Sequence, residues 1–97
     1  MTRVNFLDPA KDEMFQAEEY YEQQAPGLGR EFIAEVNHTV KGIADHPKSG
    51  RTVKREVRRR LVRRFPFGIL YRIDPNEIVI LAVMHLRRHP GYWLKRI

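Results

Sequence analysis

Apolar residues recur at helical spacing in two stretches of the chain. They form two stripes, one made of Ala10, Met14, Ala17 and Tyr21 and the other of Phe32, Val36, Val40 and Ile43. Spacings of three and four residues are typical of amphipathic helices. The first helix is expected to have Asp8 as its N-cap with Pro9 at the first helical position, and to end at Pro26-Gly27. The second begins near Leu28-Gly29 and ends before His46-Pro47. The short connection between the two predicts an antiparallel hairpin.

A different period marks the second half of the chain. Phe67, Ile69, Tyr71 and Ile73 alternate with other residues, which indicates a strand. Residues 78–83 are apolar at every position and predict a central strand covered on both faces. Residues 57–65 fit either period and are assigned to a strand because the clear alternation from Phe67 onward comes directly after them. Residues 48–52 read as a loop, and Val4 and Phe6 as a short opening strand.

This order of elements predicts an α+β fold in a single domain, residues 1–97. It has an N-terminal strand, an antiparallel helical hairpin and then a mostly antiparallel β-sheet of three or more strands. The apolar strand needs cover on its second face. Either the C-terminal segment folds back over it or a partner chain covers it, and Trp93 is expected to serve in such packing.

Charge divides the chain into two halves. Residues 1–50 carry five Lys/Arg against nine Asp/Glu, and residues 51–97 carry thirteen against three, which gives −4 and +10. The basic half is either a solvated sheet face or a contact for a polyanion or acidic protein.

Cysteine is absent, so disulfides and thiolate chemistry are excluded. No apolar run approaches the roughly 20 residues of a membrane span, and the start turns acidic too early for a secretion signal. A cytoplasmic setting is expected. The four scattered histidines have no ligand spacing, so neither a metal nor a cofactor is expected.

Several motifs together resemble one known family. They are residues 17–21, Pro26-Gly27-Leu28-Gly29 with Phe32, the stretch from Arg63 to Arg72, residues 78–83, and His85, Arg88, Pro90, Tyr92 and Trp93. In order and spacing they resemble the RelE/ParE superfamily, the toxins of bacterial type II toxin–antitoxin pairs. The resemblance implies a cognate antitoxin, ParD-like here, that binds the toxin directly in a hetero-oligomeric complex. It also implies one of two activities, because RelE-like members cleave mRNA on the ribosome and ParE-like members poison DNA gyrase.

The resemblance favours the ParE branch. Where RelE-like toxins have a catalytic arginine before the end of the middle strand, this chain has Gly68. The C-terminal tyrosine of that branch falls near Leu94, and Tyr92 lies two residues away. Gyrase poisoning is therefore the predicted activity, with no enzymatic reaction of the chain's own. The alternative is a metal-independent, ribosome-dependent endoribonuclease that uses Arg59, Arg63, His85, Arg88 and Tyr92, although a lone His at a strand end is more often a structural hydrogen-bonder. A third possibility is a non-toxic member that only binds its antitoxin or acts with it as a DNA-binding corepressor.

Two surfaces are predicted from these residues. The target-binding set is Arg58, Arg60, Arg87, Arg88 and Tyr92, and the antitoxin-binding set is Phe15, Ile33, Arg59 and Arg63. Arg58 and Arg60 should share one strand face. Arg59 and Arg63 should alternate with Val57, Leu61 and Phe65 on the other, otherwise apolar face, where unpaired cations are costly. Phe15 and Ile33 lie beside the two helical stripes, so each is either antitoxin-covered surface or the edge of the core.

Overall fold

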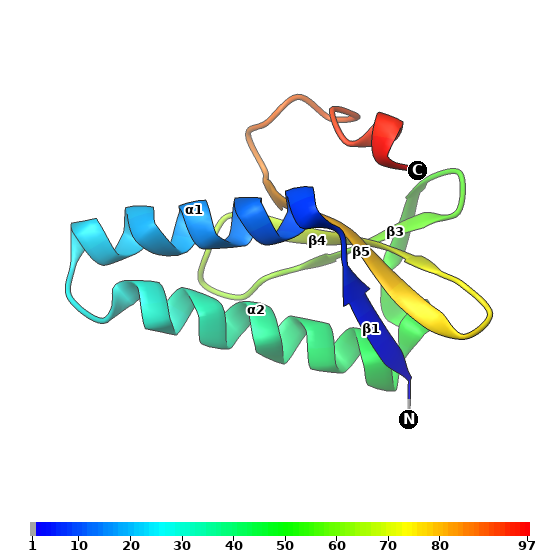
Figure 1. The fold of residues 1–97 in the computed structure, drawn as a ribbon, viewed down its shortest axis with the longest axis horizontal. Coiled ribbons are helices and arrows are strands. Elements are labelled where there is room, and N and C mark those ends of the chain that lie inside the picture. Colours follow the sequence, from blue (N-terminus) through cyan, green and yellow to red (C-terminus); the bar gives the residue numbers. More distant parts are fainter. Residues whose placement is uncertain (1) are drawn as a thin grey trace.

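A five-stranded sheet with a helical hairpin on one face organises the chain (Figure 1). This computed structural model describes residues 2–97. The elements in chain order are β1 (Arg3–Phe6), α1 (Asp8–Gln24), α2 (Leu28–Asp45), the 3₁₀ turn η1 (Pro47–Ser49), β2 (Arg51–Lys54), β3 (Val57–Leu61), β4 (Phe67–Ile73), β5 (Glu77–His85) and the 3₁₀ turn η2 (Leu94–Arg96). The predicted α+β class and the order of its elements are confirmed.

The strands lie in the order β1-β5-β4-β3-β2. β1 pairs with β5 in parallel, and the other neighbours are antiparallel. The all-apolar strand β5 therefore lies between two strands, as predicted. The loop prediction was wrong for Arg51 and Thr52, which belong to β2. All four residues of β2 are exposed, so no apolar periodicity marked it, and its pairing with β3 holds it as a strand.

The two helices form the predicted antiparallel hairpin and lie side by side (Figure 1). Leu7, and not Asp8, is the N-cap of α1, so Asp8 and Pro9 both lie in its first turn. At the other end of α1, the Glu22 carboxylate accepts hydrogen bonds from the backbone N–H groups of Gly27 at 2.9 Å and Gly29 at 3.1 Å. These are N–H groups that the start of α2 leaves without helical partners. Gly27 has φ +86°, a conformation that glycine adopts without strain.

The main core lies between the hairpin and the sheet face that it covers, here called the inner face. Both predicted helical stripes contact it, with Phe32, Val36 and Ile43 fully buried. Aromatic rings pack together in this core. The ring centre of Tyr21 lies 4.8 Å from that of Phe65 and 5.3 Å from that of Phe32. Ring contacts of this kind favour one arrangement of the rings, which holds the hairpin at a defined position on the sheet.

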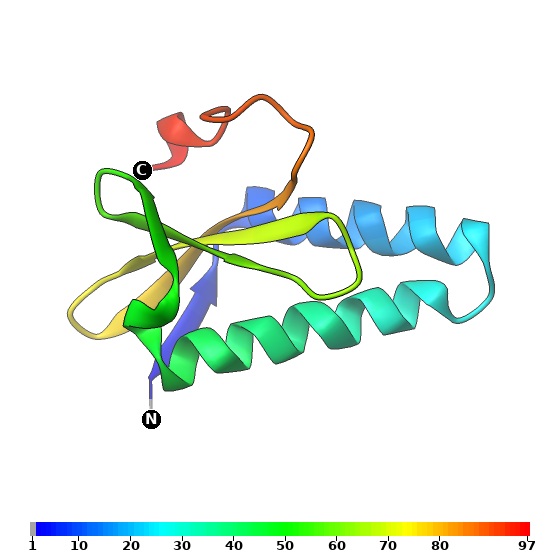
Figure 2. The ribbon, with the colours of Figure 1, turned by 180° about the vertical axis from the view of Figure 1, so that it is seen from behind.

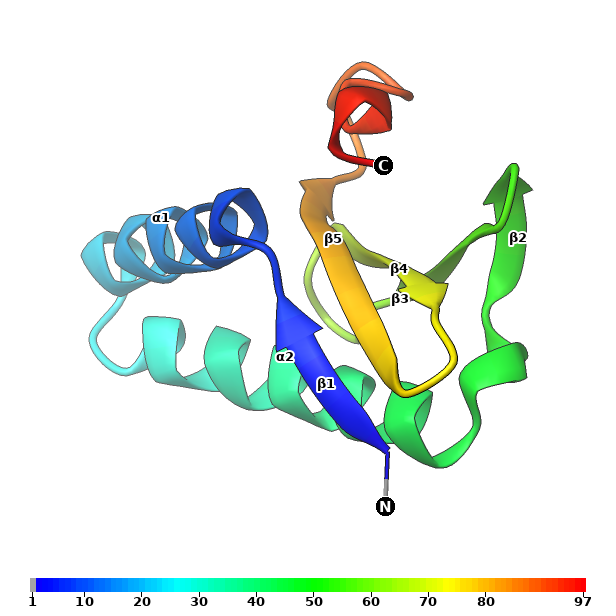
Figure 3. The ribbon, with the colours of Figure 1, turned by 45° about the vertical axis from the view of Figure 1, so that its right-hand side comes forward.

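The C-terminal segment covers the opposite, outer face of the sheet. It turns back over the strands after β5 (red in Figure 3), and Trp93, only 4% exposed, packs with Leu70, Leu81 and Met84. A register shift between Leu70 and Tyr71 leaves Leu81 without a partner on β4, so Leu81 and Ala82 both face this second cluster. The sequence left open whether the C-terminal segment or a partner chain covers the second face of β5. In the structure the C-terminal segment covers it.

Candidate functional site

A single carboxylate joins α1, β5 and the C-terminal segment. Glu13 lies in the second turn of α1, and its side chain is 12% exposed. It accepts hydrogen bonds from the backbone N–H of Val83 at 3.1 Å, the hydroxyl of Tyr92 at 2.5 Å and Nη1 of Arg96 at 2.9 Å. These four residues with Arg88 are called the Glu13 cluster below. They are up to 83 positions apart in sequence, so only the fold brings them together.

The cluster replaces a missing strand. β1 ends at Phe6, opposite Ile80, because the chain turns into α1 at Asp8. Beyond that point no strand of residues 2–97 lies on this side of β5. Glu13 accepts from the N–H of Val83, and Arg96 donates to the carbonyl of Leu81 at 3.1 Å. An ion pair of two side chains thus satisfies backbone groups that would be costly to bury unpaired.

Arg88 presents its charge at the surface of the cluster. Its guanidinium lies 3.8 Å from the centre of the Tyr92 ring and 3.4 Å from the Glu13 carboxylate, and its side chain is 54% exposed. Burial and the hydrogen bond to Glu13 raise the pKa of the Tyr92 hydroxyl well above its ordinary value. Tyr92 is therefore protonated at neutral pH, and its hydroxyl donates to Glu13. With one carboxylate against two guanidiniums, the cluster keeps a positive charge, which Arg88 exposes.

His85 ends β5 with its ring against Phe67, at 5.1 Å between centres. Its Nδ1 accepts a hydrogen bond from the backbone N–H of Arg87 at 3.0 Å. With Nδ1 as the acceptor, the ring has Nε2 left as its donor. This geometry agrees with the structural role that was preferred for His85 from the sequence.

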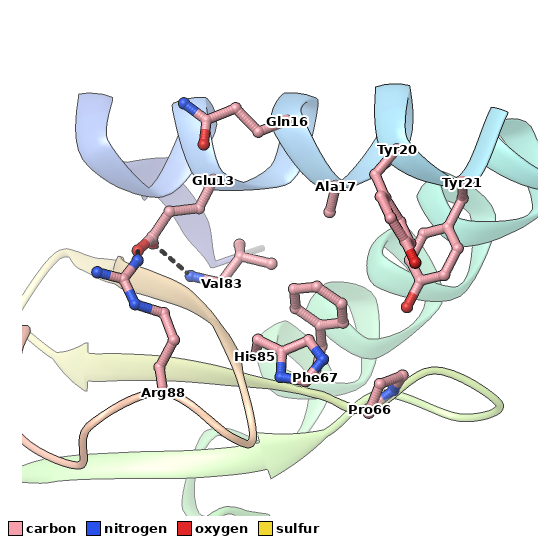
Figure 4. Close-up of a pocket in the computed structure, with 10 residues that line it drawn as sticks. All are labelled: Glu13, Gln16, Ala17, Tyr20, Tyr21, Pro66, Phe67, Val83, His85 and Arg88. Carbon is pink, nitrogen blue, oxygen red and sulfur yellow. Dashed lines mark hydrogen bonds and ion pairs between the residues drawn. The ribbon is translucent and has the colours of Figure 1, made fainter. Parts of the chain in front are cut away.

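An open groove of about 470 Å³ runs between α1 and the end of β5 (Figure 4). Its lining residues are Glu13, Gln16, Ala17, Tyr20, Tyr21, Pro66, Phe67, Val83, His85 and Arg88. The floor is apolar, and Tyr20, 58% exposed, stands at its rim. Of the predicted site residues, His85 and Arg88 share this groove, and Tyr92 adjoins it through Arg88.

Arg58 and Arg60 share one face of β3, as predicted, but both guanidiniums bond within the chain. Arg58 donates to the carbonyls of Gly50 at 2.9 Å and Lys48 at 3.2 Å. Arg60 donates to Oγ of Ser49 at 3.2 Å, and its guanidinium occupies the space where a Cβ on Gly42 would lie. The two side chains tie η1 and the residue after it to the sheet, and Arg60 also contacts the last turn of α2 at Gly42. Their predicted role at a target remains a prediction.

Arg59 and Arg63 do not share an apolar strand face, so that prediction was wrong. β3 ends at Leu61, which is 55% exposed, whereas Val62 is buried and donates its N–H to the carbonyl of Phe67. The chain then bends, and Arg63 is exposed beyond the strand. Arg59 lies on the outer face, with its stem 3.1 Å from the point where a Cβ on Gly68 would lie. The proposed nuclease set is thus divided between the two faces of the sheet.

The two apolar candidates for antitoxin contact differ in exposure. Phe15 is 54% exposed on α1, beside the acidic residues Glu18, Glu19 and Glu22. Ile33 is half-buried and packs on the main core. Phe15 remains a candidate for a partner contact, whereas Ile33 belongs to the edge of the core.

Glu13 and Arg96 were not identified from the sequence. Glu13 is not part of the apolar stripe predicted for the first helix, although it lies three residues after Ala10 and four before Ala17, both buried. Two small residues at that spacing let a helix approach a sheet closely, and a carboxylate between them faces the same neighbour.

Within residues 2–97 no group of three or more metal-ligating side chains occurs, and no helix is long and apolar enough to cross a membrane.

Comparison with known proteins identifies the family. Residues 4–90 match the model of the ParE toxin of type II toxin–antitoxin systems, parDE. The chain belongs to the ParE toxin family. No curated protein matches it. Among solved structures, it is similar to the chromosomal ParDE TA system from P. aeruginosa, with a TM-score of 0.79 at 19% identity over 90% of this chain and 98% of that one.

A second similar structure is the toxin–antitoxin complex RelBE2 from Mycobacterium tuberculosis. The TM-score is 0.57 at 24% identity, over 87% of this chain and 96% of that one. At these identities both likenesses concern the fold. The family match over residues 4–90, together with this shared fold, confirms the resemblance drawn from the sequence.

Proposed function

We propose that this chain is a growth-inhibiting toxin that poisons DNA gyrase and is neutralised by direct binding of a cognate, ParD-like antitoxin. Membership of the ParE toxin family supports the toxin–antitoxin part of the proposal. The choice of gyrase rests on the Glu13 cluster, whose ionisable groups are already paired with one another.

RNA cleavage without a metal needs a base for the 2′-OH, an acid for the leaving oxygen and positive charge at the phosphorane. Tyr92 keeps its proton and directs it to Glu13, and Nδ1 of His85 is occupied by a backbone N–H. Arg59 lies on the outer face of the sheet, whereas His85 packs on Phe67 of the inner face. This commitment of the candidate acids and bases favours a binding surface over a reactive one.

Gly68 adds a second argument. A Cβ at this position would lie 3.1 Å from both Cγ and Cδ of Arg59. That separation is tighter than ordinary contact, so an arginine here would displace the Arg59 stem. The position where RelE-like toxins have a catalytic arginine is therefore adapted in this chain to packing of a neighbour.

The proposed contact surface consists of Arg87, Arg88 and Tyr92. Arg87 is exposed, and the half-exposed Arg88 has its guanidinium over the Tyr92 ring and paired with Glu13. A cation fixed in this way loses less side-chain entropy on binding than a free arginine. The target-binding roles of Arg58 and Arg60 are secondary in this proposal because their guanidiniums already bond within the chain.

One observation favours the ribosome-dependent endoribonuclease as the second candidate. Arg88 and His85 line the same open groove, where a cation and an Nε2–H donor could both contact a phosphate. This reaction would still require a base that the groove does not offer in free form.

The deciding experiment is induction of the chain alone in a bacterial host. A DNA-damage reporter and incorporation of a labelled amino acid are followed over the same minutes. Gyrase poisoning predicts an early damage response while translation continues. Arg88→Ala should weaken the response and still bind the antitoxin, whereas Arg30→Ala, an exposed cation of α2, serves as the charge-matched control. Prompt arrest of translation without damage would overturn the gyrase proposal in favour of the nuclease.

A further inference from the structure

The sheet has a free edge at β2. This strand is last in the sheet order and pairs only with β3, so among residues 2–97 no strand covers its other side. All four of its residues are exposed. An uncovered edge of this kind offers backbone N–H and C=O groups to an additional strand.

Cations gather on the outer face of this edge. Arg51 lies directly opposite Arg59, and Lys54 lies opposite Val57, whose side chain belongs to the outer cluster. Within the described chain, no carboxylate lies within salt-bridge distance of Arg51, Lys54 or Arg59. Like charges directly opposite each other on neighbouring strands destabilise the pair. A bound anion would relieve this repulsion.

An apolar groove lies beside these cations. It has a volume of about 210 Å³ and is lined by Val53, Lys54, Arg59, Leu70, Met84, Pro90, Gly91 and Trp93. Its walls come from Val53 and Lys54 of β2 and from Pro90, Gly91 and Trp93 of the C-terminal segment. The β2–β3 hairpin and the C-terminal segment lie at the same end of the molecule (Figure 2). Leu70, Met84 and Trp93 are buried, so the bottom of the groove is apolar and only its rim is charged.

We propose that an acidic segment of the antitoxin, in extended conformation, adds to β2 as a sixth strand. Its carboxylates pair with Arg51, Lys54 and Arg59, and one apolar side chain enters the groove beside Trp93. This inference rests on the proposed function in one respect, since it takes an antitoxin as the partner. It assigns that partner a charge, a conformation and a place on the sheet.

Two other occupants fit the edge less well. A second copy of this chain would place Arg51 and Lys54 against their own counterparts, and their charges oppose such pairing. A nucleic acid would satisfy the cations but not the strand edge. Trp93, the aromatic side chain that lines the groove, is 4% exposed and offers no face for stacking a base.

The test uses the whole chain, co-purified with the product of the adjacent gene. Hydrogen exchange is compared between the free chain and the complex. The amides of residues 51–54 that point away from β3 should exchange at least about tenfold more slowly in the complex, because they gain partners in the added strand. If the complex forms but these amides exchange as fast as in the free chain, the inference is wrong and the proposed function stands. If no complex forms, the antitoxin pairing itself fails, and the inference with it.

Charge reversal provides the second arm. The double variant Arg51→Glu/Lys54→Glu should weaken antitoxin binding by about 10- to 100-fold at low salt, with a smaller difference at high salt. The control Lys11→Glu/Lys41→Glu reverses two exposed cations of α1 and α2 and should leave affinity within about threefold. Equal affinity of the two double variants would refute the inference. So would a selective loss of binding to a DNA duplex of about 20 base pairs with antitoxin affinity unchanged, which would assign the face to nucleic acid.

Discussion

Replacing Glu13 by alanine tests how the site is held together. The substitution removes the acceptor of Val83, Tyr92 and Arg96 at once. It leaves the guanidinium of Arg96, only 18% exposed, without its carboxylate. Removing one partner of a fully buried ion pair costs about 3–5 kcal/mol, and this pair is near the surface at one end. We therefore expect the free energy of unfolding to fall by about 2–4 kcal/mol.

Urea denaturation of the purified chain, followed by the fluorescence of its single tryptophan, measures this change. Trp93 packs in the C-terminal segment that the cluster holds, so its emission should report release of that segment. In a domain of this size the expected loss lowers the melting temperature by about 10–20 °C. The matched control is Glu19→Ala, an exposed carboxylate on the same helix, which should change stability by less than about 0.5 kcal/mol.

A double-mutant cycle separates the ion pair from general damage to α1. Glu13→Ala, Arg96→Met and the double variant should give a coupling energy above about 1 kcal/mol, because each residue's cost depends on the other. A Glu13→Ala loss no larger than that of Glu19→Ala, or a coupling energy near zero, would refute the view that these side chains replace a strand neighbour of β5.

The contacts of the core and the site support three further predictions. Tyr71→Phe should cost about 2–3 kcal/mol in urea denaturation, because the lost hydroxyl leaves a buried N–H and a carbonyl unpaired; an unchanged midpoint would contradict this. Tyr92 has a raised pKa in the folded state, so its stabilising effect is complete below about pH 10, the unfolded value, and declines as the pH rises further. Tyr92→Phe should then show a shallower loss of stability between about pH 10 and 11 than the unchanged chain, and parallel curves would argue against it. Gly68→Ala should cost about 1–2 kcal/mol and should cost clearly less when Arg59 is also alanine, since the clash is with the Arg59 stem. Additive costs in that pair would show that the stem is not the obstacle.

The elements with a strong apolar period were predictable. The stripes at Phe32 and along β4 placed the hairpin and the middle of the sheet, and the all-apolar run placed β5 at its centre. β2 could not be predicted, because a fully exposed edge strand has no buried face to impose a period. The break after Leu61 was also missed, since the burial of Val62 depends on the turn after it and not on the alternation before it.

The candidate site was predictable only in part. Arg88, Tyr92 and His85 were selected through the motifs that resemble the RelE/ParE toxins. Their hydrogen-bond partners were not predictable from the sequence. Tyr92 donates to the Glu13 carboxylate, and His85 accepts from the backbone N–H of Arg87. Glu13 lies on a helix, 79 positions before Tyr92 in the chain.

The sequence by itself determined the class of fold, the charge division of the chain and its likeness to the RelE/ParE toxins. These depend on local periodicity, composition and motif order, which each segment carries independently of the others. Only the tertiary structure decided which of the thirteen cations in residues 51–97 are engaged and which are free. Arg58, Arg60 and Arg96 bond inside the chain, whereas Arg51 and Arg59 face each other without a carboxylate within salt-bridge distance in the part of the chain described. The reason is that a charge is satisfied by whatever lies near it in space, and those neighbours come from distant parts of the sequence.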